Sequence, residues 1–112
     1  MFYRQGFEDL HQIVEGELNL AIENHGFFKS RHEAWAVLRE EVIEAREELE
    51  AVEDGLEVLD LMVRLDKETD YAEIKSVFTH AKLLAMEAVQ VAAMALKWTR
   101  GIENEKHTSG SE

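Results

Sequence analysis

The sequence contains no cysteine and no proline among its 112 residues. The lack of cysteine excludes disulfide bonds, zinc sites built from thiolates and catalysis by a thiol. The lack of proline, together with abundant Ala, Leu, Glu and Met, leaves little in the chain that would break a helix. We therefore expect an all-α protein with a single domain, because a chain of this length supports one modest core.

Positive charge and long apolar segments are also scarce. The chain has 24 acidic and 12 basic residues, and its net charge of −12 should repel nucleic acids and anionic membranes. Residues 1–7 lack the apolar run of a secretory signal, and no uncharged apolar segment approaches the roughly 20 residues of a membrane span. We predict a cytoplasmic protein with no nucleic-acid or membrane partner, whose excess carboxylates either serve solubility or bind hard divalent cations.

Apolar residues recur at intervals of three and four, which predicts about four helices in a bundle. Gly26 should end the first helix, and Ser30 with Glu33 forms a capping box at the start of the second. Gly55 and Gly101 are the expected ends of later helices. The expected helices cover residues 7–24, 30 to about 54, 56–65 and 71–100. The domain should therefore span residues 1–100, with a flexible tail over residues 101–112.

One glutamate interrupts the most apolar part of the chain. Between Leu83 and Leu96, only Glu87 and Gln90 are not apolar, so this segment should be buried on several sides. A glutamate in such surroundings must be protonated, paired with a cation or bound to a metal. A structural alternative pairs Glu87 with Lys97, Arg39 or Arg46.

A second group of acids lies on the helix that begins at Ser30. Glu41 borders the apolar stripe of that helix, and Glu44 follows one turn later. Two carboxylates one turn apart can share a Mg²⁺ ion, although any exposed Glu-rich helix contains such a pair. Facing helices that each present inward acids are a recurrent way to build a metal site in a bundle.

Residues 32–45 (HEAWAVLREEVIEA) and 87–97 (EAVQVAAMALK) together resemble the MazG-like nucleoside triphosphate pyrophosphohydrolases, and particularly their short phage and prophage members. The resemblance covers roughly residues 7–100. It implies an all-α, oligomeric enzyme that holds Mg²⁺ on a Glu-x-x-Glu pair and a later Glu-x-x-Asp pair. Such an enzyme cleaves (d)NTP to (d)NMP and pyrophosphate, in nucleotide-pool housekeeping or phage nucleotide metabolism.

Carried onto this sequence, the resemblance assigns the first metal pair to Glu41 and Glu44, and Glu40 matches the acid that precedes them. The second pair is open. Glu87 matches its glutamate, but Gln90 stands where the family has aspartate. Residues 57–60, which run from Glu57 to Asp60, keep the aspartate but share a charged face with Arg64 and Lys67. We favour Glu87 with Gln90.

The resulting hypothesis is a hydrolase in which Mg²⁺, or Mn²⁺, activates a water that attacks the α-phosphorus, with Glu40 or Glu44 as the general base. Lys29 and Arg31 at a helix N-terminus, and Lys97, could bind the outer phosphates, or they could be plain surface charge. The competing hypothesis is a catalytically impaired helical module with an oligomerising or regulatory role, which Gln90 favours. The breadth of the apolar segment predicts a homodimer or homotetramer.

Overall fold

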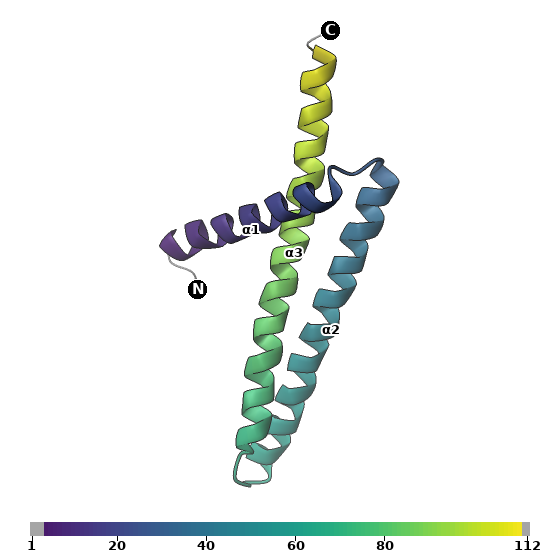
Figure 1. The fold of residues 1–112 in the computed structure, drawn as a ribbon. Coiled ribbons are helices and arrows are strands. Elements are labelled where there is room, and N and C mark those ends of the chain that lie inside the picture. The colour runs from purple at the N-terminus through teal and green to yellow at the C-terminus, as the bar shows by residue number, and fades with distance from the viewer. Residues whose placement is uncertain (1–3, 111–112) are drawn as a thin grey trace. The chain divides into compact units, whose positions relative to one another are not determined.

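The computed structural model describes residues 4–110, with side chains described from residue 4 to residue 106. It contains three helices, α1 (Arg4–His25), α2 (Arg31–Arg64) and α3 (Tyr71–Gly110), and no strand within those residues (Figure 1). The all-α prediction is confirmed. No helix in the described part of the chain is both long enough and apolar enough to cross a membrane.

The boundaries between the helices follow from local chemistry. Gly26 adopts a left-handed backbone conformation (φ 71°) immediately after α1, as the sequence predicts. The Ser30 hydroxyl accepts a hydrogen bond of 3.1 Å from the Glu33 amide and caps α2. The Asp70 carboxylate accepts one of 2.9 Å from the Ala72 amide and caps α3. Side chains two or three residues away therefore determine where α2 and α3 begin.

The prediction of about four helices is wrong, because Gly55 does not end a helix. It lies inside α2 and is buried. A Cβ atom at this position would be 2.6 Å from Val77 Cγ2 on α3. The glycine thus permits a close approach of two helices, and this packing role outweighs the low helix propensity of glycine. The helix predicted over residues 56–65 is the final part of α2.

Gly101 also lies inside a helix. The predicted end of the last helix at this residue is wrong, since the backbone of α3 continues to Gly110. A Cβ at Gly101 would be 3.6 Å from the Phe27 ring, which is an ordinary contact distance. Neither proline nor a strong turn signal follows Gly101, so one glycine is not enough to stop the helix. Residues 111–112 of the predicted tail lie outside the described residues.

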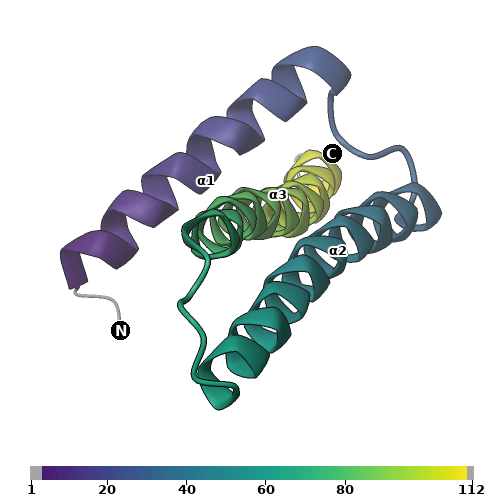
Figure 2. The same ribbon diagram turned by 90° about the horizontal axis from the view of Figure 1, so that it is seen from below.

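The helices divide between two compact units. The first unit contains the described residues up to Glu41 and those from Val89 onward. In it, α1 crosses the second half of α3 (Figure 1), and α3 lies between α1 and the beginning of α2 (Figure 2). Its core is built around Val14, Ala93 and Met94, and Leu18 is its only large side chain that is completely buried among the described residues.

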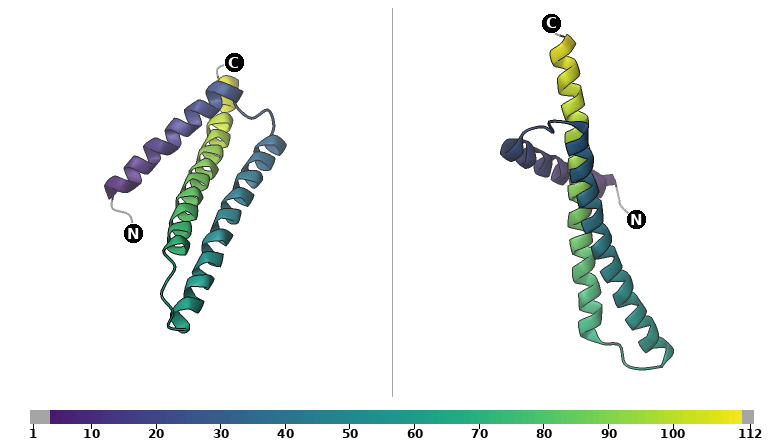
Figure 3. Two further views of the ribbon diagram at one scale, coloured as in Figure 1. Left: turned by 60° about the horizontal axis from the view of Figure 1, so that its bottom comes forward. Right: turned by 90° about the vertical axis from the view of Figure 1, so that its right-hand side faces the viewer.

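The second unit consists of residues Val42–Ala88. Here the later part of α2 and the first half of α3 run antiparallel and are joined by residues 65–70 (Figure 3). Most of its large apolar side chains are only partly covered, and Leu61 and Phe78 are 57% and 60% exposed. This unit is therefore a helical hairpin with little buried apolar core of its own.

Candidate functional site

Glu87 lies in the hairpin unit and is the most unusual acid among the described residues. Its side chain is half-buried, and its Oε2 atom is the only side-chain polar atom in the described part of the chain that is buried without a hydrogen-bond partner. Burial raises the pKa of Glu87 above its ordinary value, and the nearby carboxylates of Glu44 and Glu48 raise that pKa further. Glu87 thus needs either a proton or a cation.

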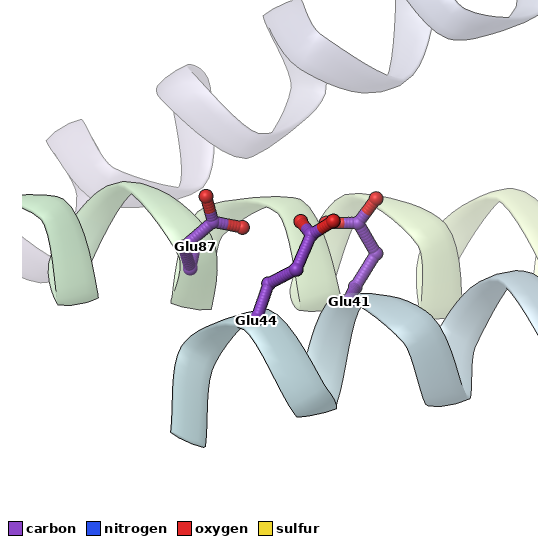
Figure 4. A group of neighbouring side chains, drawn as sticks. All are labelled: Glu41, Glu44 and Glu87. Atoms are coloured by element: carbon purple, nitrogen blue, oxygen red, sulfur yellow. The ribbon is translucent and has the colours of Figure 1, made fainter. Parts of the chain in front are cut away.

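Three carboxylates meet at this position. Single oxygen atoms of Glu41, Glu44 and Glu87 lie within 4.8 Å of one another (Figure 4). Glu44 and Glu87 both belong to the hairpin unit, and Glu41 precedes Glu44 by one turn on the same continuous helix. Figure 4 shows the two side chains from α2 and the one from α3 pointing toward a common space. These are the three acids that the sequence analysis singled out as metal ligands.

The donor set suits a hard divalent cation. Carboxylate oxygens are the ligands that Mg²⁺ and Mn²⁺ prefer, and a separation below 4.8 Å allows three of them to contact one ion. Without a cation, the same crowding favours a proton on Glu87 that it donates to Glu44. The Oε2 atom of the half-buried Glu87 has no hydrogen-bond partner among the described residues, and either a proton or a cation would satisfy it.

A histidine stands at the edge of this group. The His80 Nδ1 atom is 2.7 Å from the Glu48 carboxylate, which in turn acts electrostatically on Glu87. The five histidines show no metal-ligand spacing, so the sequence does not predict this contact. His80 lies seven residues before Glu87, two helical turns away, and that interval was the available signal. His80 holds Glu48 in place beside the three acids.

Gln90 has a hydrogen-bond partner on another helix. Its Nε2 atom donates a hydrogen bond of 2.8 Å to the Glu17 carboxylate on α1. Gln90 and Glu17 both belong to the first unit. The NH₂ group of Gln90 is therefore engaged in a contact between α3 and α1, which gives this side chain a structural role in the first unit.

The other predicted acids lie apart from the cluster. Glu40 is exposed, and its position on α2 directs it away from the stripe that Glu41 borders. Glu57 and Asp60 are exposed on α2, and Asp60 forms an ion pair of 3.0 Å with Arg64. An exposed ion pair between residues one helical turn apart is typical of a solvated helix surface. Of the two candidate second pairs, only Glu87 joins Glu41 and Glu44.

Two of the three predicted phosphate-binding cations share a cavity. Arg31 and Lys97 line a cavity of about 300 Å³ in the first unit, at the N-terminus of α2. Lys97 is only 4% exposed, and its Nζ atom lies 4.2 Å from the centroid of the Phe28 ring. Lys29 is exposed and does not line the cavity. The remaining lining residues are Phe28, Ser30, Trp98, Gly101, Ile102 and Glu105.

Comparisons with known proteins do not assign the chain to a family. No family model matches it, and no curated protein and no solved structure is significantly similar to it. The resemblance to MazG-like enzymes therefore stays a prediction from the motif residues.

Proposed function

We propose that this protein is a Mg²⁺-dependent nucleoside triphosphate pyrophosphohydrolase that uses Glu41, Glu44 and Glu87 as metal ligands. The observation that carries the proposal is the buried Oε2 atom of Glu87, which has no partner and lies beside two further carboxylates. A divalent cation would satisfy this atom and neutralise the cluster. Mn²⁺ fits the same donor set.

The chemistry divides between the cation and the protein. A divalent cation held by Glu41, Glu44 and Glu87 would neutralise charge on the triphosphate and make water a better nucleophile. Glu44, whose carboxylate contacts Glu87 and raises the pKa of Glu87, would accept the proton of the attacking water. The water oxygen forms a bond to the α-phosphorus, the bond to the bridging oxygen breaks, and pyrophosphate leaves. Glu48, held by His80, keeps the surroundings of this base negative.

Self-association is part of the proposal. Large apolar side chains remain exposed in both units, among them Trp35 at 58% and Phe78 at 60%. A homodimer or homotetramer would cover such residues, as apolar surfaces of this kind usually mark interfaces. Analytical ultracentrifugation should show a species larger than the monomer. A monomer at high micromolar concentration would contradict this part of the proposal.

A second candidate is a helical module that binds no metal and acts as an oligomerising or regulatory partner. The hydrogen bond between Gln90 and Glu17 favours it, because that bond gives Gln90 a structural role in packing α3 against α1, and Gln90 stands where the family has an acidic ligand. In this case Glu87 is protonated and donates to Glu44. The two candidates differ in whether a cation binds at all.

The test is pyrophosphate release from a panel of ribo- and deoxyribonucleoside triphosphates, with Mg²⁺ or Mn²⁺ and again with excess chelator. The proposal predicts release that requires the cation and that Glu87→Gln abolishes. The matched control is Glu57→Gln, which removes an exposed acid from the other candidate pair and should keep full activity. Absence of release from every nucleotide by a folded helical protein would favour the metal-free module.

A further inference from the structure

Lys97 is a charged side chain in a place that normally excludes charge. It is 4% exposed, and the contact that holds its ammonium group is the face of Phe28 at 4.2 Å. No carboxylate pairs with it in the part of the chain that the structure describes. A contact with an aromatic face recovers only part of the hydration that a buried ammonium loses. The group is therefore incompletely satisfied by the protein alone.

The Lys97 ammonium is accessible from the cavity. Lys97 lines this cavity, and its Nζ atom is not among the side-chain atoms that are buried without a partner. The aliphatic stem is thus covered by the core while the charged end reaches the cavity. Arg31 adds a second positive charge from another helix.

The same cavity lies at the start of α2, where backbone amides are free to donate. Ser30 caps the Glu33 amide with its hydroxyl and the Ala34 amide with its carbonyl oxygen. The amides of Arg31 and His32 precede the first intrahelical hydrogen bond and have no acceptor within the helix. Helix N-termini with free amides favour anions. Two cations and a helix N-terminus therefore point to one anionic ligand.

The rest of the lining suggests what the anion is attached to. Trp98, Ile102 and Phe28 provide an apolar wall beside the charged end. A cavity of about 300 Å³ holds a small phosphorylated molecule with a compact planar or apolar body. The net charge of −12 disfavours general attraction of anions, so binding here would need these local groups.

We propose that the cavity formed by Arg31, Lys97 and the N-terminus of α2 is a binding site for a small phosphate ester with a planar or apolar body. The phosphate lies against Arg31 and Lys97, and the planar or apolar body of the ligand contacts Trp98 and Ile102. None of these residues belongs to the acid cluster, so the site does not depend on the proposed hydrolase function.

The test is isothermal titration calorimetry with inorganic phosphate and with phenyl phosphate, in excess chelator so that no divalent cation contributes. Phenyl phosphate should bind more tightly than inorganic phosphate, because its ring contacts the apolar wall. Lys97→Met and Arg31→Gln should each weaken binding by about tenfold or more, the usual effect of losing one charged hydrogen bond. No binding of either probe by the unsubstituted protein would overturn the proposal.

Three further variants separate binding at this cavity from general charge attraction and from the metal site. Lys29→Gln removes an exposed cation next to the cavity and should leave affinity unchanged; an equal loss with this variant would refute a specific site. Glu105→Gln removes the one acid among the described residues that line the cavity and should strengthen binding. Weaker binding after Glu105→Gln would contradict the placement of the phosphate. Glu87→Gln should bind phenyl phosphate normally, so failure of the metal site would not affect this result.

Discussion

α3 carries two charged side chains within or beside its most apolar segment, and the two units accommodate them in opposite ways. Lys97 is buried in the first unit, where an aromatic ring and an open cavity receive its ammonium group. Glu87 lies in the hairpin unit, where its nearest charged neighbours are other carboxylates. The Lys97 ammonium thus has an aromatic contact and access to a cavity, whereas the half-buried Glu87 carboxylate has like charges around it and one atom without a partner. This difference separates a candidate anion-binding group from a candidate cation ligand.

Truncation of Lys97 should have the largest effect. Lys97→Ala removes a buried aliphatic stem and leaves a void, so the free energy of unfolding should fall by about 2–4 kcal/mol in urea denaturation. Lys97→Met keeps the volume and should cost less than about 1 kcal/mol. An equal loss in both variants would show that the charge, and not the stem, stabilises the first unit.

Gln90→Asp should destabilise the protein by about 1–3 kcal/mol. It removes the donor to Glu17 and places two carboxylates together. Glu17→Gln in the same protein should restore stability, because the glutamine at position 17 can donate to the new aspartate. Urea unfolding of the single and double variants measures this coupling.

The same substitution also tests the metal ligands. The family pattern makes aspartate at position 90 a ligand, whereas the structure directs position 90 toward α1. Mn²⁺ affinity should therefore be unchanged in Gln90→Asp. A clear gain in affinity would mean that this side chain reaches the acid cluster.

Gly55→Ala should reduce the free energy of unfolding by about 1 kcal/mol. The added methyl group overpacks the contact between the helices, and the higher helix propensity of alanine offsets part of that cost. The added Cβ would lie 2.6 Å from Val77 Cγ2, so α2 and α3 would have to move apart in the hairpin that holds Glu87. Val77→Ala should remove most of this penalty in the double variant. Thermal unfolding that is unchanged or raised by Gly55→Ala alone would contradict the close helix approach.

The capping residues show what could be predicted from the sequence. Ser30 and Gly26 act on atoms within a few residues, so their patterns identified two helix boundaries correctly. Gly55 and Gly101 look equally like helix ends, yet each lies inside a helix. Whether a glycine ends a helix or admits a neighbouring helix depends on tertiary contacts, which the local pattern does not contain.

The candidate site shows the same limit. The placement of Glu41 and Glu44 one turn apart, and of Glu87 in an apolar segment, follows from spacing and composition. The partner of Gln90 could not be predicted, because Glu17 lies 73 residues away on α1. Lys97 and Arg31 were selected as single cations, and their common cavity appears only once α2 and α3 are assembled.

The smallest effect concerns pH. Since the pKa of Glu87 is raised in the folded protein, the folded state binds more protons than the unfolded state between the ordinary pKa of 4.5 and the raised one. Stability in chelator should therefore fall as pH rises through this window. Glu87→Gln should lack this contribution and be slightly more stable than the unsubstituted protein at neutral pH. A stability difference between the two proteins that is independent of pH would contradict the shift.

The most direct test of the metal site is calorimetric titration with Mn²⁺ of the unsubstituted protein, Glu87→Gln and Glu57→Gln, in buffers of different ionisation enthalpy. Near the raised pKa of Glu87, a cation must displace the proton from this carboxyl group, so binding should release protons. The account predicts one site with proton release in the unsubstituted protein and in Glu57→Gln, and loss of both in Glu87→Gln. Equal Mn²⁺ binding by Glu87→Gln, or no binding by any of the three proteins, would contradict it.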